Sequence, residues 1–211
     1  ALLSRPDLDQ LAALIRDRDI YLISDEVYEH LVFDGASHAS VLAHEELYAR
    51  AYVVSSFGKT YHVTGWKTGY VVAPPALTAE LRKVHQFVTF VAVTPLQHAL
   101  ADFMVEHPEH IAELPAFYQA KRDLFCDQLA GSRFAFTRTP GTYFQIVDYS
   151  AIRPDLDDVA MAEWLTREQG VAAIPVSVFY QQPPAGMRLV RFCFAKREET
   201  LLAAGAKLCA I

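Results

Sequence analysis

The sequence has few of the features that mark a membrane, disulfide-bonded or nucleic-acid-binding protein. Its three cysteines, Cys126, Cys193 and Cys209, form no Cys-x-x-Cys pair, so neither a disulfide framework nor a cysteine zinc site is predicted. No apolar run reaches the ~18 residues that a membrane helix needs. Nineteen basic residues against 25 acidic ones give a formal charge of −6, which disfavours nucleic acid as a partner. We therefore predict a soluble, cytoplasmic protein with reduced thiols and no membrane association.

What the sequence does contain is enough apolar material for a substantial core. Of the 211 residues, 52% are hydrophobic and 12% aromatic. Such a composition excludes an intrinsically disordered chain, because abundant apolar side chains offset the entropy cost of folding. The length suits one large domain or two small ones.

The first third of the sequence alternates between helical and strand-like patterns. Apolar spacing of three and four residues predicts a helix over residues 6–17. Short continuous apolar runs at 20–23, 51–54 and 69–73 predict strands of a parallel sheet that is covered on both faces. Helical patterning over 40–50 lies between the first two runs, which indicates a right-handed parallel crossover.

The rest of the sequence predicts three helices and then a mixed α+β region. The expected helices are 77–90, 95–106 and 109–130, followed by strands at 134–137, 143–148, 171–174 and 187–195 and helices at 157–169 and 198–208. We expect a domain boundary near residues 120–132, taken as 125/126. The predicted fold class is α/β, with a smaller α+β part at the C-terminus.

Polar residues gather where the first two predicted strands end. Asp25 and Tyr28 follow one strand, and Ser55, Ser56 and Lys59 follow the next. Each has an ordinary structural interpretation by itself, as a turn, packing or solvated residue. Ligands of open α/β sheets bind beyond the carboxyl ends of the strands, so these side chains together indicate a binding site.

Four motifs carry a resemblance to a known family. Ser24–His30 (SDEVYEH) and Ser55–Tyr70 (SSFGKTYHVTGWKTGY) resemble the core of the fold-type I, class I/II aminotransferases, which use pyridoxal 5′-phosphate (PLP). Ile174–Phe179 (IPVSVF) and Met187–Lys196 (MRLVRFCFAK) resemble the methionine and kynurenine/glutamine aminotransferase subgroup. The likeness covers essentially the whole chain.

The resemblance implies a PLP-dependent transferase-like fold. Residues 1–125 would form the C-terminal portion of a large, mostly parallel PLP-binding domain, and residues 126–211 would form the small C-terminal α+β domain. Ala1–Asp9 resembles the stretch directly after the family's Asn-Pro-x-x-Pro-Thr-Gly segment. We therefore expect this chain to be the C-terminal half of a longer enzyme, inactive by itself, whose complete form is a homodimer.

Three residues match positions that carry the family's chemistry. Lys59 would form the Schiff base with the cofactor and then act as general base and acid at the substrate α-carbon. Asp25 would pair with the pyridine nitrogen and keep it protonated. Tyr28 would donate a hydrogen bond to the phenolic oxygen of the ring.

Other matched positions would hold the phosphate and the substrate. Ser56 and Lys67 match the phosphate anchors, one hydroxyl donor and one cation. Arg191 matches the residue that binds the substrate α-carboxylate through a bidentate fork. We expect the nearby Arg188 to have a structural role.

The sequence predicts no metal site. His107 and His110 have a suggestive spacing, but Pro108 interrupts the helix that would align their rings and no third ligand is adjacent. We expect both histidines to be exposed at a helix start.

The implied reaction moves an amino group between an amino acid, such as methionine, glutamine or an aromatic one, and a 2-oxo acid. A cysteine-conjugate β-lyase would use the same Lys59 and Asp25 and stays open as an alternative. An effector domain of a transcriptional regulator and a remnant without cofactor also stay open.

Overall fold

The computed structural model describes residues 2–211, and the chain divides into two compact units, Ala1–Pro115 and Ala116–Ile211. The division lies inside helix α6 (His110–Leu129). The expected boundary at 125/126 lies further along the same helix. Within residues 2–211, no helix is both long and apolar enough to cross a membrane.

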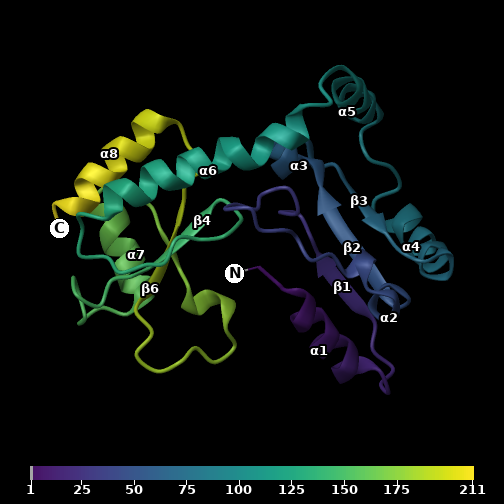
Figure 1. Ribbon diagram of the computed structural model, residues 1–211, viewed down its shortest axis with the longest axis horizontal. Coiled ribbons are helices and arrows are strands. Elements are labelled where there is room, and N and C mark those ends of the chain that lie inside the picture. The colour runs from purple at the N-terminus through teal and green to yellow at the C-terminus, as the bar shows by residue number, and fades with distance from the viewer. Residues whose placement is uncertain (1) are drawn as a thin grey trace. The chain divides into compact units, whose positions relative to one another are not determined.

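Unit 1 is built on a three-stranded sheet with helices before, between and after its strands (Figure 1). Its elements are α1 (Arg5–Ile15), β1 (Leu22–Asp25), η1 (Val41–Ala43), α2 (Glu45–Tyr48), β2 (Ala51–Ser56), α3 (Phe57–Thr60), η2 (Thr64–Trp66), β3 (Gly69–Val72), α4 (Pro75–Val88) and α5 (Thr94–Glu106). The predicted helix over residues 40–50 is wrong in its extent, because extended backbone at His44 separates η1 from α2.

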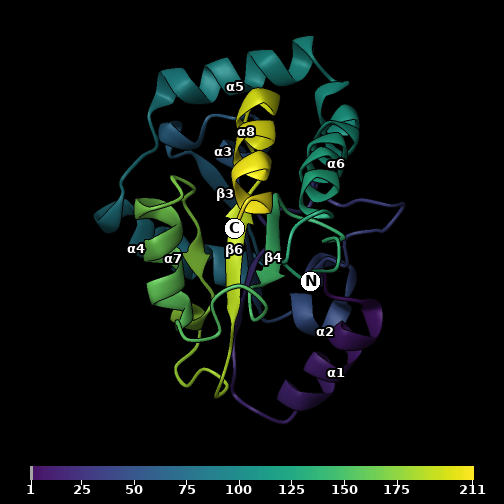
Figure 2. The same ribbon diagram turned by 90° about the vertical axis from the view of Figure 1, so that its left-hand side faces the viewer.

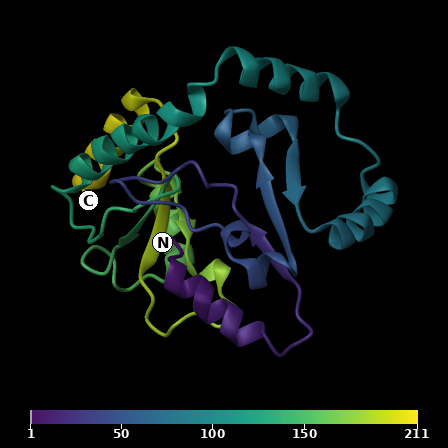
Figure 3. The same cartoon turned by 45° about the vertical axis from the view of Figure 1, so that its right-hand side comes forward.

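The sheet of unit 1 is mixed. Strand β1 pairs in parallel with β2, as the strand-helix-strand pattern predicts. Strand β3 pairs antiparallel with β2, so the expectation of a third parallel strand is wrong. The reason is the connection over residues 57–68, which turns the chain back beside β2 through two short helical turns; the opposed arrows of β2 and β3 are visible in Figure 3.

Helix α1 and the segment before β2 cover one face of this sheet. Ser4 caps α1 by a reciprocal hydrogen-bond pair with Asp7, which satisfies donors at the helix N-terminus. The buried face of α1 packs in a core with side chains of η1, α2 and β2: Leu8, Ala12, Ile15, Val41, Leu47, Ala51 and Val53. Because side chains alternate along a strand, the other residues of β2, Tyr52, Val54 and Ser56, point to the opposite face.

Unit 2 contains an antiparallel sheet with strand order β4-β6-β5. Its elements are the larger part of α6, β4 (Phe144–Asp148), α7 (Asp158–Arg167), β5 (Ile174–Pro175), η3 (Ser177–Phe179), β6 (Leu189–Cys193) and α8 (Glu198–Cys209). The strand predicted at 134–137 is wrong, since that segment forms only an isolated bridge between Ala135 and Asp148.

One face of this second sheet is buried and the other is open. Gln145, Val147, Val190 and Phe192 are buried on the covered face, where the Phe192 ring contacts Phe125 of α6 with centroids 5.8 Å apart. Figure 2 shows α6, α7 and α8 around strands β4 and β6. The alternate residues of both strands point to the open face.

Candidate functional site

A cavity of about 380 Å³ lies at the carboxyl ends of β1 and β2, entirely within unit 1. It brings together four of the predicted site residues, Asp25, Ser56, Lys59 and Lys67. The other residues that line it are Val27, Val54, Ser55, Thr64, Thr68 and Gly69. The sheet face that bears Asp25 and Ser56 lies opposite the apolar core, so the cavity opens on the side that α1 leaves uncovered.

Asp25 is the last residue of β1 and is exposed. It stands opposite Val54 in the parallel register, which places both side chains on the cavity face. One carboxylate oxygen, Oδ1, accepts a hydrogen bond from the Val27 backbone N–H at 3.1 Å. That local turn holds the carboxylate at the strand end.

Lys59 lies on α3, a single helical turn that follows β2 directly. The Ser56 side chain caps this turn by accepting a hydrogen bond from the Gly58 N–H at 3.1 Å. Position 58 has no room for a side chain, since a Cβ there would lie 2.8 Å from the Thr64 Cα. Glycine therefore lets the following loop pass close to the turn that carries the half-buried Lys59.

Lys67 has a left-handed backbone, with φ 54° and ψ 36°, directly after η2. A non-glycine residue in this region is strained, and such residues cluster at ligand-binding sites. Two residues on, Gly69 lies so close to β2 that a Cβ would sit 2.5 Å from the Ser55 carbonyl oxygen. No atom lies within 4 Å of a Cβ at Gly65, so close packing requires a glycine at 69 and not at 65.

The Ser56 hydroxyl has backbone partners on two sides. Besides capping α3, its Oγ donates to the Thr68 carbonyl oxygen at a long 3.4 Å. The cap holds the serine at the cavity wall, while the long bond is weak. The hydroxyl proton is therefore available to a better acceptor.

The structure leaves Tyr28 outside this group. Tyr28 is half-buried and is not among the described residues that line the cavity. Its assignment to the phenolic oxygen of the cofactor stays a prediction.

Sequence reasoning missed a buried carboxylate beside the site. Glu26 accepts hydrogen bonds from the Ser24 hydroxyl at 3.0 Å and the Val41 N–H at 2.9 Å, and lies 2.7 Å from His38 Nε2. Burial alone raises the pKa of Glu26, but these hydrogen bonds and one from Ser40 outweigh it and lower the pKa to about 2. Glu26 is thus an ionised anchor directly after Asp25.

A second carboxylate connects the segment after β1 with β2 and β3. Glu29 Oε1 accepts hydrogen bonds from the Tyr70 hydroxyl at 2.6 Å and from the Ser55 hydroxyl at 3.1 Å. Burial, and then the hydrogen bond to Glu29, raises the pKa of Tyr70. No local sequence pattern indicates these contacts, because Ser55 and Tyr70 lie 26 and 41 residues after Glu29.

His110 also supports the turn that carries Lys59. Its Nε2 lies 2.7 Å from the Thr60 carbonyl oxygen, and its ring stacks on Tyr61 with centroids 5.2 Å apart. The expectation that His110 is exposed is therefore wrong, since packing against α3 buries half of it. His107 is exposed. Over residues 2–211, no group of three or more potential metal-ligating residues is found.

The groups around the cavity fit PLP. An amine on Lys59 suits an aldehyde, and the Asp25 carboxylate suits a protonated ring nitrogen. The Lys67 cation and the Ser56 hydroxyl suit a phosphate.

Arg191 belongs to unit 2, on β6. Its guanidinium carbon lies 3.9 Å from the centroid of the Phe144 ring and 4.7 Å from that of Phe179. Its Nε is buried and has no hydrogen-bond partner among the described residues. Arg188, by contrast, donates to the carbonyl oxygens of Pro154 and Met187.

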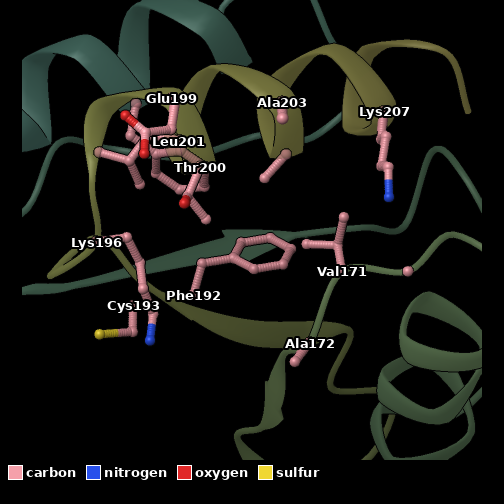
Figure 4. Close-up of a pocket in the computed structure, with 13 residues that line it drawn as sticks. Val171, Ala172, Phe192, Cys193, Lys196, Glu199, Thr200, Leu201, Ala203 and Lys207 are labelled. Carbon is pink, nitrogen blue, oxygen red and sulfur yellow. The ribbon is translucent and has the colours of Figure 1, made fainter.

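Unit 2 also holds a larger cavity, of about 550 Å³, between α8 and the loop before β5 (Figure 4). Phe192 lies at its centre in this view, with Lys196 and Lys207 toward its two ends. None of the predicted site residues lines it. This cavity is therefore separate from the predicted site.

Comparisons with known proteins agree with the geometry. Residues 1–207 match the sequence model of the family described as aminotransferase class I and II. A methionine aminotransferase of Escherichia coli is 54% identical over 96% of this chain and 52% of its own length. Human kynurenine–oxoglutarate transaminase 1 is 34% identical over 97% of this chain and 53% of its own length.

Solved structures give the same result. The crystal structure of an E. coli protein with methionine aminotransferase function superimposes with a TM-score of 0.93 at 53% identity, covering 99% of this chain and 55% of that one. The N-succinyldiaminopimelate aminotransferase of Mycobacterium tuberculosis gives 0.91 at 34% identity, covering 100% and 54%. The chain spans about half the length of the relatives it matches.

Proposed function

The chain belongs to the class I and II aminotransferase family, and on that premise we propose that it carries the catalytic lysine and the carboxylate-binding arginine of a PLP-dependent aminotransferase. The reaction moves an amino group between an amino acid and a 2-oxo acid. Residues 1–125 would belong to the large cofactor-binding domain and residues 126–211 to the small domain.

One observation carries this proposal. Asp25, Ser56, Lys59 and Lys67, chosen from motifs up to 42 residues apart, line the same cavity. Unrelated surface residues would have no reason to converge in this way, whereas a cofactor with an aldehyde, a ring nitrogen and a phosphate needs all four groups.

Lys59, Asp25 and Tyr28 have different roles in the proposed reaction. When bound, PLP supplies the aldehyde that receives the amino group and a ring that takes up electron density from the substrate α-carbon. The Lys59 Nζ would act as the general base that takes the proton from that carbon and as the general acid that then gives the proton up to the reacting group. The Asp25 carboxylate keeps the proton on the ring nitrogen, and Tyr28 donates to the phenolic oxygen.

The remaining site residues bind the cofactor phosphate and the substrate carboxylate. The Ser56 hydroxyl and the Lys67 ammonium hold the phosphate through charge-assisted hydrogen bonds. Arg191 holds the substrate α-carboxylate with two parallel N–H donors, a geometry that lysine does not offer.

We favour methionine as the amino donor. The E. coli relative at 54% identity is a methionine aminotransferase, whereas the kynurenine transaminases are 33–37% identical. Glutamine and aromatic amino acids are the next substrates to test.

A homodimer is the proposed assembly. Helices α4 and α5 and the segment between them expose large apolar side chains, among them Phe87, Val88, Phe90 and Val105. Exposed apolar area of this kind marks a surface that another part of a protein covers.

The proposed location is the cytoplasm. The three cysteines of the chain are free, which fits a reducing compartment.

The test begins with a family-length protein, in which this chain is joined to the rest of the aminotransferase fold. Incubation with PLP and reduction with borohydride are expected to attach the cofactor to Lys59, which peptide mapping by mass spectrometry reads directly. Labelling of another lysine, or none, contradicts the proposal. Lys67→Arg is the matched control, because it keeps the cation and leaves Lys59 in place.

The products then define the reaction. With methionine and a 2-oxo acid acceptor, transfer yields the 2-oxo acid of methionine. With a cysteine conjugate, pyruvate, ammonia and a thiol reveal β-elimination. Elimination without transfer would replace the proposed reaction by a carbon–sulfur lyase.

A further inference from the structure

Arg191 lies on the open face of the sheet in unit 2, beside exposed apolar side chains. Its cross-strand neighbours in register are Ile146 on β4 and Ile174 on β5. These isoleucines are 44% and 43% exposed, whereas Val190 and Phe192, which flank Arg191 in sequence, are buried on the other face. The arginine therefore stands in an apolar surface with no carboxylate opposite it in the sheet.

Two aromatic rings hold the guanidinium group in this surface. Phe144 comes from β4 and Phe179 from η3, so the arginine is held from two separate elements. Both ring centroids lie within the ~6 Å at which a cation is attracted by an aromatic face. Ring faces attract the cation but provide no in-plane acceptor for its N–H groups.

The two rings therefore fix the position of the Arg191 guanidinium while its N–H donors stay available to a ligand. A buried N–H group is paired in the great majority of cases, yet the buried Arg191 Nε has no partner among the described residues. A guanidinium group offers five donors in a plane and matches a carboxylate through two of them. The site therefore suits an external carboxylate, and its isoleucine neighbours suit an apolar ligand body.

We propose that Phe144 and Phe179 are positioning residues that orient Arg191 for the α-carboxylate of an amino acid with an apolar side chain. This inference rests on the proposed function and deepens it. The rings restrict the guanidinium to one orientation, so less freedom is lost when the carboxylate binds. Phe179 is 59% exposed, which leaves part of its ring available to the substrate.

The experiment replaces the rings in the PLP-loaded family-length protein. Phe144→Leu and Phe179→Leu, singly and together, are expected to raise the KM for methionine by about 2- to 30-fold each while kcat changes less than about twofold. Phe144→Tyr keeps an aromatic face and is expected to restore the KM. A merely structural role would lower kcat and the amount of folded protein instead.

A matched control comes from the same unit. Phe117 is half-exposed and lies under the Lys121 ammonium at 4.8 Å, so Phe117→Leu removes the same kind of contact away from Arg191. Its KM is expected to stay at the unchanged value. An equal rise in the Phe117 variant overturns the proposal.

A binding measurement separates positioning from chemistry. 4-(Methylthio)butanoate, which is methionine without its amino group, is titrated by calorimetry into the same variants, and its Kd is expected to rise in parallel with KM. Unchanged KM and Kd in the double variant, with Lys59 still labelled by borohydride, overturn this inference alone. Loss of Lys59 labelling in the unsubstituted protein instead overturns the proposed function, and this role of the two rings with it.

Discussion

The Nε2 of His110 lies 2.7 Å from the carbonyl oxygen of Thr60, the residue directly after Lys59. Since a carbonyl only accepts, this nitrogen carries the proton and donates it. The start of α6 thereby fixes the end of the turn that carries the lysine. The contact joins residues 50 positions apart, so it orders the site through tertiary structure.

Replacing His110 is expected to loosen this turn. His110→Phe keeps a ring to stack on Tyr61 but leaves the carbonyl of the buried Thr60 without its donor, which costs about 1–2 kcal/mol. Chemical unfolding of the 211-residue chain measures the loss. His107→Phe, three residues earlier and exposed, is the control and is expected to change the free energy of unfolding by less than about 0.5 kcal/mol. Equal losses would contradict the role of the Thr60 contact.

The stability of unit 1 is expected to fall in acid because of Glu26. Its pKa is lowered from 4.5 to about 2 in the folded chain, so its ionised form stabilises folding above pH ~4.5. This contribution, on the order of 2–3 kcal/mol, is lost as the pH falls from 4.5 toward 2. Unfolding free energies measured between pH 6 and pH 2 test the slope. In Glu26→Gln that part of the slope should disappear, and a slope that persists unchanged would assign it to other carboxylates.

The two glycines around Lys67 are expected to respond differently to substitution. Gly69→Ala places a Cβ 2.5 Å from the Ser55 carbonyl oxygen, which forces β3 away from β2 and costs about 1–3 kcal/mol. Gly65→Ala meets no atom within 4 Å and is expected to be nearly neutral. Thermal unfolding of the two variants side by side measures the difference. A Gly65 variant as unstable as the Gly69 variant would show that the close approach at Gly69 is not the cause.

Asp25→Asn is expected to weaken cofactor binding. The change removes the charge that pairs with the protonated ring nitrogen, which corresponds to roughly a 10- to 100-fold higher Kd for PLP. Absorbance titration of the family-length protein measures it. Asp19→Asn, at an exposed position away from the cavity, provides the comparison and should leave the Kd unchanged. If both variants bind PLP as before, Asp25 does not contact the ring.

Arg191→Lys is expected to weaken substrate binding by about 2–3 kcal/mol, because a single ammonium replaces a charge-assisted fork. The effect should appear in KM for methionine, with the absorbance of the bound cofactor unchanged. Arg188→Lys changes a residue that donates only to backbone carbonyls and should leave KM near its original value. A substrate constant that survives Arg191→Lys would remove the arginine from the site.

The sequence alone was sufficient for the family and for five of the ten residues that line the cavity. The motifs around Asp25 and Lys59 lie at the ends of strands whose apolar runs are continuous over four residues. The end of such an apolar run shows where the strand ends. Ligands of open α/β sheets bind beyond the carboxyl ends of the strands, so polar residues at that point are expected to face the ligand. The strand ends therefore group Asp25, Ser56 and Lys59, whereas Lys67 joins them only through the resemblance of its motif to the aminotransferases.

Tertiary structure alone decided the direction of β3 and what surrounds the charged groups. An apolar run specifies a buried strand but not the direction of its neighbour, so β3 was expected to be parallel and is antiparallel. Likewise, no local pattern links Glu26 to His38, or Arg191 to Phe179. Periodicity reports which side of an element is apolar, whereas hydrogen bonds and ring contacts depend on segments that only the folded chain brings together.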